Sequence, residues 1–392
     1  MISSRKAATL FSMAATVAIV VSACSGSAAT TAPAAATDTP ATVASAPASV
    51  APSAAGAAGC KVGVSWNNYA EERWAKWDEP AIKAALTKAG ATYLSNDAKS
   101  SADTQLSNVD ALINQGAKVV IILAQDGTAI KPAVTKALAA GVAVIAYDRL
   151  IEDPGVFYIT FDNVLVGKMQ ATAVLAAKSS GNFVIIKGNK ADANADFLRA
   201  GMVEAGMPDV GKTDPAGKIK IVAEQYTDNW DPTNAQNEMT AILTAQSNKV
   251  DAVISENDGM AGGVVAALAS QGMAGTVPVS GQDGDAAALN RIALGTQTVD
   301  VWKDARLLGQ GAGEAAALLC GGTALGKITT SSGASAIFKY TNKTTSVETD
   351  LNSVLIKPEA ITKDNLSDVL NAGWIDKATL CKGVKAGAVT GC

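Results

Sequence analysis

Planar hydrogen-bonding side chains follow short apolar segments at five separate places along this chain. They are Asn67 and Asn68, Asp148 and Arg149, residues 189–194, Asn257 and Asp258, and Gln282 and Asp283. Carboxylate, amide and guanidinium groups can each bond two neighbouring hydroxyls, and an aromatic face can cover the C–H face of a sugar ring. Four tryptophans lie in or near the same segments: Trp66, Trp74, Trp230 and Trp302. The set predicts a cleft that binds a neutral polyol.

Each of these residues also has a purely structural interpretation. Asp and Asn directly after a strand commonly cap the next helix or form a turn, and this interpretation accounts for any single residue as well as ligand contact does. In open α/β sheets, however, ligands bind outside the carboxyl ends of the strands. Five such sites at the same end of their strands favour a ligand site over capping alone.

The elements that carry these side chains alternate between two patterns. Unbroken apolar runs at 62–64, 119–123 and 142–146 predict strands that are buried on both faces. Helical periodicity at 73–89, 102–115 and 129–140 predicts helices between them, with Gly90, Gly116 and Gly141 at the position that follows a helix end. The repeat predicts a parallel sheet covered by helices.

The same pattern restarts after Asp162. Strands are predicted at 183–187, 219–222, 252–255 and 277–280, and helices at 164–178, 195–205, 234–245 and 261–271. An apolar segment at 297–302 and a long helix at 305–319 then precede a less regular tail. The fold class is therefore α/β, with two similar domains.

Composition narrows the range of functions. The chain has 392 residues and a net charge of −4, and it contains no run of basic residues, which argues against a nucleic-acid partner. It has no His, and so lacks the commonest metal ligand and the usual general base. We expect no metal, no cofactor and no enzymatic activity. Asp148 and Asp283 could be cast as a glycosidase pair, but Arg149 beside Asp148 would hold that carboxyl ionised.

The N-terminal segment predicts export. Arg5 and Lys6 precede an apolar run at 14–21, and residues 21–24 match a lipobox in which Cys24 would be lipidated. A transmembrane anchor is the alternative, but the run is too short to span about 30 Å of hydrocarbon. We expect a signal peptide at 1–23, an Ala/Thr/Pro-rich tether at 24–59, and attachment to the outer face of the cytoplasmic membrane or a periplasmic location.

Four further cysteines remain: Cys60, Cys320, Cys381 and Cys392. Their spacing resembles no zinc site, and disulfides persist in exported proteins. Of the three possible pairings we favour Cys60–Cys320 and Cys381–Cys392, with free buried thiols as the alternative.

Five short segments, taken in order, carry a family resemblance. They lie at 72–74, 146–151, 161–163, 280–283 and 295–299, and they read ERW, AYDRLI, FDN, SGQD and GTQTV. Together they resemble the D-xylose-binding proteins of bacterial ABC sugar importers, which are type I periplasmic binding proteins of the ribose/galactose-binding-like family. The resemblance extends from about residue 61 to about residue 380.

That resemblance implies two Rossmann-like lobes joined by a three-segment hinge, in a monomer. The first lobe would comprise 60–162 plus 299–350, and the second 163–298 plus 351–392. The ligand would be a monosaccharide, with D-xylose favoured over glucose, arabinose or a short xylo-oligosaccharide. The partner would be an ABC permease, or alternatively a membrane sensor. The implied sugar contacts are Arg73, Trp74, Asp148, Arg149, Asp192, Asn194, Trp230, Asn257, Asp283 and Lys303, with Trp74 and Trp230 on either side of the ring.

Two segments depart from the family's pattern. Asn67 and Asn68 stand where an acidic pair is usual, and residues 124–127 replace a stretch that commonly contains an aromatic residue. Both are expected near the cleft, where such a change is worth about 1–3 kcal/mol and can reorder preferences among sugars.

Overall fold

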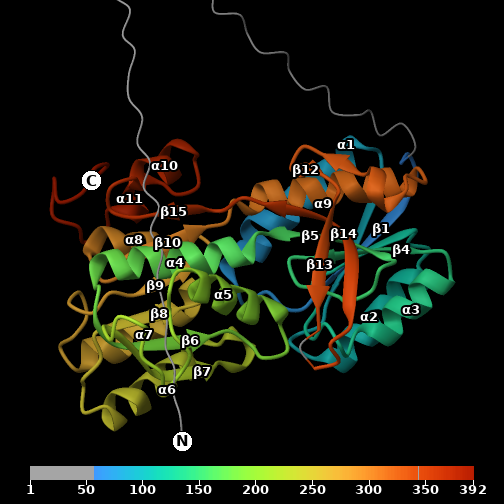
Figure 1. The fold of residues 1–392 in the computed structure, drawn as a ribbon. Coiled ribbons are helices and arrows are strands. Elements are labelled where there is room, and N and C mark those ends of the chain that lie inside the picture. The colour runs from blue at the N-terminus through green and yellow to red at the C-terminus, as the bar shows by residue number, and fades with distance from the viewer. Residues whose placement is uncertain (1–56, 343) are drawn as a thin grey trace, which may run out of the picture. The chain divides into compact units, whose positions relative to one another are not determined.

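Two α/β lobes make up the part of the chain that the computed structural model describes, residues 57–342 and 344–392 (Figure 1). The predicted signal peptide, Cys24 and nearly all of the predicted tether lie outside the described residues. Each lobe is built around a mainly parallel sheet with helices on both faces.

The first lobe contains a seven-stranded sheet in the order β13-β14-β5-β4-β3-β1-β2. Its strands are β1 Lys61–Trp66, β2 Thr92–Asp97, β3 Val119–Ile122, β4 Ala143–Tyr147, β5 Val156–Phe161, β13 Ala336–Thr341 and β14 Glu348–Ile356. All neighbours pair in parallel except β13 and β14, which are antiparallel. A separate pair of short strands, β11 Thr329–Thr330 and β12 Gly333–Ala334, connects the last helix of this lobe to β13.

Helices cover both faces of this sheet. They are η1 Trp74–Asp78 with α1 Glu79–Lys88, α2 Ala102–Asn114, α3 Lys131–Ala139, and α9 Ala305–Cys320, which is followed by η3 Leu325–Lys327. Alternate residues of β3 and β4 point to opposite faces, so Ile121 and Ile145 pack with α1 and α9, while Val120 and Val144 pack with α2 and α3. Figure 1 shows the two helix pairs on opposite sides of the strands.

The second lobe contains two three-stranded sheets, β7-β6-β8 and β15-β10-β9, linked by a bridge between Val253 and Val279. Its strands are β6 Gly181–Lys187, β7 Ile219–Tyr226, β8 Ala252–Ser255, β9 Ser280–Gln282, β10 Val299–Trp302 and β15 Glu359–Ile361. Its helices are α4 Asn163–Ala177, α5 Ala193–Glu204, η2 Asp228–Trp230, α6 Pro232–Ala245, α7 Asp258–Ser270, α8 Ala286–Leu294, α10 Leu366–Asn371 and α11 Lys377–Leu380.

Most predicted strands and helices of both series are present, and the predicted α/β class is confirmed. Strand β2 was not predicted, because it is only partly buried and lacks an apolar run. Strand β5 was also not predicted, although all six of its residues are buried. The predicted lobe boundaries at 298/299 and 350/351 differ from the strand pairing. Strand β10 pairs with β9 and β15 in the second lobe, while β14 pairs with β5 in the first. The chain therefore crosses between lobes after Phe161, after Trp302 and after Ile356. Each of these residues is the last one of a strand, so the strand pairs within one lobe over its whole length before the chain passes to the other lobe.

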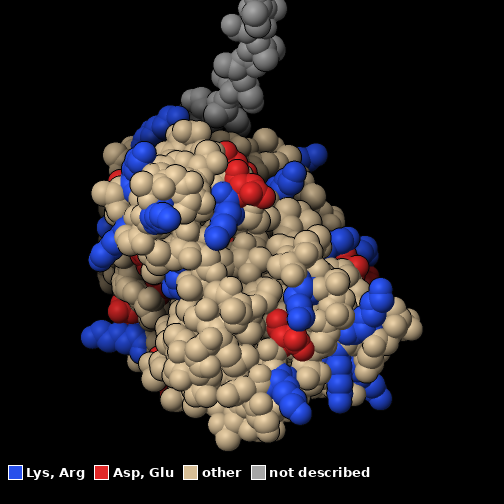
Figure 2. Space-filling view, turned by 90° about the vertical axis from the view of Figure 1, so that its left-hand side faces the viewer, with Lys and Arg blue, Asp and Glu red and all other residues tan. Residues whose placement is uncertain are grey.

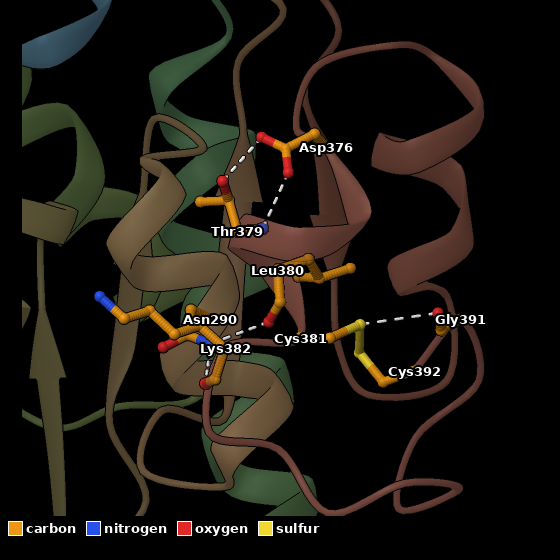
Figure 3. Close-up of a disulfide and its surroundings, with 8 residues drawn as sticks. All are labelled: Asn290, Asp376, Thr379, Leu380, Cys381, Lys382, Gly391 and Cys392. Carbon is orange, nitrogen blue, oxygen red and sulfur yellow. Dashed lines mark hydrogen bonds between the residues drawn. A yellow bond between two sulfur atoms is a disulfide. The ribbon is translucent and has the colours of Figure 1, made fainter.

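The structure contains both favoured disulfides, Cys60–Cys320 and Cys381–Cys392. The first joins the residue before β1 to the last residue of α9, within the first lobe. The second closes the C-terminal segment beside α8 (Figure 3), where Asn290 donates hydrogen bonds to the carbonyls of Leu380 and Lys382. The irregular tail is thus fixed to the second lobe.

One face of the molecule is shown in Figure 2, where Lys and Arg side chains are scattered over a mainly uncharged surface. Among the helices of the described residues, none has the length and apolarity needed to cross a bilayer.

Candidate functional site

A small cavity lies between the carboxyl ends of strands from the two lobes. Nine of the ten predicted ligand-binding residues line it, all except Arg73. The complete lining is Glu71, Trp74, Asp148, Arg149, Asp192, Asn194, Trp230, Asn257, Gln282, Asp283 and Lys303. Side chains separated by up to about 230 positions in the chain therefore meet, because the carboxyl ends of several parallel strands of both lobes face this space.

Arg73 lies behind the cavity wall rather than in it. Its Nε and Nη2 donate to the Asp78 carboxylate at 3.1 and 2.9 Å, and its Nη1 lies 3.2 Å from Asp148 and 3.3 Å from Asp283. The Tyr147 hydroxyl also donates to Asp78. Tyr147 thus holds the Asp78 carboxylate in place, and Asp78 in turn holds Arg73. Burial raises the pKa of Asp78 to about 6, although Arg73 opposes that shift. Arg73 thus positions two cavity carboxylates, one from each lobe.

Several hydrogen bonds and ion pairs join the lobes around the cavity. Arg149 of the first lobe lies 3.0 Å from Asp192 of the second, and its Nη1 also donates to the Ala124 carbonyl at 3.1 Å. Further along the interface, Gln125 Nε2 donates to Asn229 Oδ1 at 2.9 Å. The lobes are therefore closed on one another, with polar groups of opposite lobes paired directly.

Helix capping and cavity lining are combined in the same side chains. Asp192 Oδ1 accepts from the Asn194 amide at the start of α5, while its Oδ2 faces Arg149. Asn257 Oδ1 caps α7 by accepting from the Met260 amide, while its Nδ2 donates to Glu71. These side chains both cap a helix and line the cavity, because one polar atom of each planar group bonds the helix and the other faces the cavity. The cap fixes the end that faces the cavity.

Three residues that line the cavity have a strained backbone. Asp148, Trp230 and Asp283 have φ angles of 63°, 57° and 102°, values that non-glycine residues rarely adopt. The Asp148 carbonyl is held by Thr160 Oγ1 at 2.7 Å and by Asn194 Nδ2 at 3.1 Å. Residues held in such conformations by their surroundings are typical of functional sites.

Tryptophans from opposite lobes line the cavity. Trp74 is contributed by the first lobe and Trp230 by the second, and both are buried. Their indole Nε1 atoms and Gln282 Oε1 have no hydrogen-bond partner among the described residues. Buried polar atoms are rarely left unpaired, so these three identify positions where a polar ligand would complete the site.

Some expectations about the cavity were wrong or incomplete. Asn67, Asn68 and Gln125 do not belong to the described lining, since Asn67 and Gln125 bond to each other at 3.4 Å and Asn68 bonds to Ser100. Glu71 was missed as a lining residue, because sequence alone does not tell which of two adjacent glutamates faces inward. Gln282 was noted at its strand end but not assigned as a contact. No group of three potential metal ligands occurs within residues 57–342 and 344–392.

Two α/β lobes that close around a cavity of planar polar groups and tryptophans define a two-lobed solute-binding protein. Residues 62–324 match the family model described as "Periplasmic binding protein domain", and the chain belongs to this family. The predicted family and type I fold are confirmed.

Individual relatives agree with this assignment. The chain is 40% identical over 263 residues to the D-xylose-binding periplasmic protein of Escherichia coli K12, covering 67% of this chain and 78% of that protein. It is 37% identical over 257 residues to the protein of the same description from Haemophilus influenzae, covering 65% and 76%. A carbohydrate transporter solute-binding protein from Chloroflexus aurantiacus, solved in complex with D-glucose, superposes with a TM-score of 0.69 at 29% identity, over 81% of this chain and 97% of that chain. Proteins of this family bind solutes for transport.

Proposed function

We propose that this protein is an exported sugar-binding lipoprotein that captures D-xylose and delivers it to an ABC permease. The observation that carries the proposal is the cavity itself, where paired planar groups and a tryptophan from each lobe surround a small space between the lobes. The names of the two bacterial relatives favour xylose as the ligand.

Capture would proceed by hinge closure. In the closed structure, Arg149 bonds Asp192 and Glu71 bonds Asn257, each across the lobe interface. A sugar held between the lobes presents hydroxyls to both partners of each pair, so that it bridges groups that otherwise bond directly. Because the open protein offers only half of these contacts, the ligand stabilises the closed state.

The carboxylates of the site suit binding better than catalysis. Asp148 and Asp283, the pair that a glycosidase would need, both lie within 3.3 Å of Arg73. The same guanidinium therefore engages both carboxylates, whereas the acid of a glycosidase must direct a proton at the glycosidic oxygen. We infer that the protein binds sugar without transforming it.

Calorimetric titration of the purified full-length protein with D-xylose, D-glucose, D-ribose and L-arabinose tests the ligand. Micromolar or tighter binding of xylose, preferred over the other three, is expected. Preference for glucose, the ligand of the Chloroflexus relative, would retain the mechanism and change the substrate. Failure to bind any of the four would overturn the proposal.

The lipid anchor is tested separately at Cys24. The Cys24→Ala variant should leave the membrane fraction and keep its sugar affinity, since the cavity is formed by residues 71–303. Retention of the variant in membranes would contradict lipidation at this residue. A monomer is expected by light scattering with and without sugar.

A further inference from the structure

Glu71 is a carboxylate of the cavity wall that the family resemblance did not assign. It lies in the first lobe, in the segment between β1 and η1, two residues before Arg73. Its Oε1 accepts a hydrogen bond of 3.1 Å from Asn257 Nδ2 of the second lobe. The contact therefore exists only when the lobes are closed.

The cavity contains more carboxylates than cations. Its lining includes four acidic residues and two basic ones, Arg149 and Lys303. Asp192 forms an ion pair with Arg149 at 3.0 Å. Arg73, which lies behind the cavity wall, forms ion pairs with both Asp148 and Asp283. Glu71 has no cationic nitrogen within 4.0 Å among the described residues. It is the acidic group of the lining left without an ion pair.

Charged groups from several elements face Glu71. Burial raises its pKa to about 7, and Asp283 of the second lobe adds to this shift, while Arg149 and Arg73 oppose it. Asp285, which follows β9, also interacts with Glu71, and its own pKa is raised by burial and by neighbouring carboxylates. In an open cleft filled with water, a glutamate has a pKa of about 4.3. Closure therefore favours the protonated form of this side chain.

We propose that Glu71 is a further sugar-binding residue, which bonds a hydroxyl of the ligand in place of Asn257 when the lobes close on a sugar. This inference rests on the proposed sugar-binding function and deepens it. A neutral carboxyl group can both donate to and accept from a hydroxyl, so Glu71 would supply the cavity with a further donor. The amide of Asn257, released from Glu71, remains available to a second hydroxyl.

Sugar capture then takes up a proton. The carboxyl has the higher pKa in the closed state, so affinity rises as the pH falls from about 7 toward about 4.3, by up to tenfold per pH unit. Above pH 7 both states are ionised and the affinity reaches its lower plateau. Asp78, whose pKa is about 6, contributes little to this slope, because its partners Arg73 and Tyr147 belong to the same lobe and stay with it when the lobes separate.

Titration of the full-length protein with D-xylose between pH 5 and pH 8 tests the inference. Wild type should bind more tightly at pH 5 than at pH 8, and should take up most of one proton at pH 6, measured in two buffers of different ionisation enthalpy. Glu71→Gln, a neutral isostere, should bind tightly at every pH with no proton uptake. Glu71→Ala should lose about three- to tenfold in affinity at pH 5, the value of one hydrogen bond.

Glu72→Gln is the matched control, since Glu72 is exposed and pairs with Lys76. This variant should keep the wild-type pH slope. An unchanged slope in Glu71→Gln, unchanged affinity in Glu71→Ala, or absence of proton uptake by wild type would overturn the role of Glu71 while leaving sugar binding intact. If wild type bound no sugar, both the proposed function and this inference would fall together.

Discussion

Arg149 Nε lies 3.0 Å from Asp192 Oδ2, so a guanidinium of the first lobe and a carboxylate of the second form a buried ion pair across the lobe interface. Both side chains are less than a tenth exposed in the closed protein. Water would solvate each of them in an open protein, and this offsets most of their attraction. The pair therefore orients the two lobes as they close, but it contributes little net free energy to the closed state.

Replacing Arg149 with Ala should abolish most sugar affinity. The expected loss is about 2–5 kcal/mol, which is the usual effect of removing one partner of a buried charged pair at an interface. Unliganded thermal stability should change little, because the open protein can solvate Asp192. Titration calorimetry and thermal melting measure the two effects. A large fall in the unliganded melting temperature would identify a structural ion pair instead, and Lys136→Ala, which removes an exposed pair with Asp110, serves as control.

The position of the Trp230 ring depends on Gly188. A Cβ at Gly188 would lie 2.1 Å from the ring atoms Cη2 and Cζ2, so Gly188→Ala must displace the indole from the cavity wall. The overpacking should lower stability by about 1–3 kcal/mol, and affinity for sugar should fall because the indole no longer covers the ring. Gly262→Ala is the control, since its Cβ would meet only the Arg291 side chain, at 3.3 Å, which does not line the cavity. Equal affinities of the two variants would show that the indole does not contact the ligand.

Closure should be visible in tryptophan fluorescence. Trp77 of the first lobe stacks on Trp374 of the second at 4.6 Å between ring centroids, and Trp374 donates to the Gly284 carbonyl next to Asp283. Trp77→Phe should weaken sugar binding about two- to tenfold, as expected from about 0.5–1.5 kcal/mol for an aromatic pair. It should also reduce the emission change on adding D-xylose. An unaltered emission change would mean that this stack does not report on closure.

The two disulfides should differ in their effect on stability. Cys60–Cys320 spans 260 residues, whereas Cys381–Cys392 spans 11. In the chain-entropy account, removing the first by double Cys→Ser substitution should cost about 5–6 kcal/mol and removing the second about 2–3 kcal/mol. Denaturant midpoints of the two variants provide the comparison. The reverse order would show that local strain or residual structure in the unfolded chain dominates over loop length.

Much of the fold could be predicted because most strands of the βα repeat are short, continuous runs of buried apolar residues. Strands such as β3, with all four residues buried, have no polar face to obscure the pattern. Strand β2 lies at the edge of its sheet and alternates only weakly, so its sequence lacks this signal. The predicted points at which the chain crosses between the lobes differ from the observed ones by several residues. A strand that is followed by a crossing has the same local composition as any other strand, so the sequence does not mark the crossing.

The lining residues could be predicted from strand ends, but their partners could not. Asp192 and Asn257 were selected by their positions, and both face the cavity. The placement of Arg73 behind the wall depends on Asp78 and Tyr147, which are 69 residues apart and meet only in the folded lobe. Glu71 illustrates the same limit, because its role depends on Asn257, which lies 186 residues further along the chain.

The position of Cys60 has a mechanical consequence. This residue directly precedes β1, an interior strand of the first sheet, and its disulfide reaches the last residue of α9. A pull on the chain from the N-terminal side would therefore be divided at Cys60 between β1 and α9, which packs across the same sheet. Rupture would require a strand and a helix to be displaced together, rather than one strand to be drawn out alone. The first lobe is thereby built to bear load at the point where its leading segment joins it.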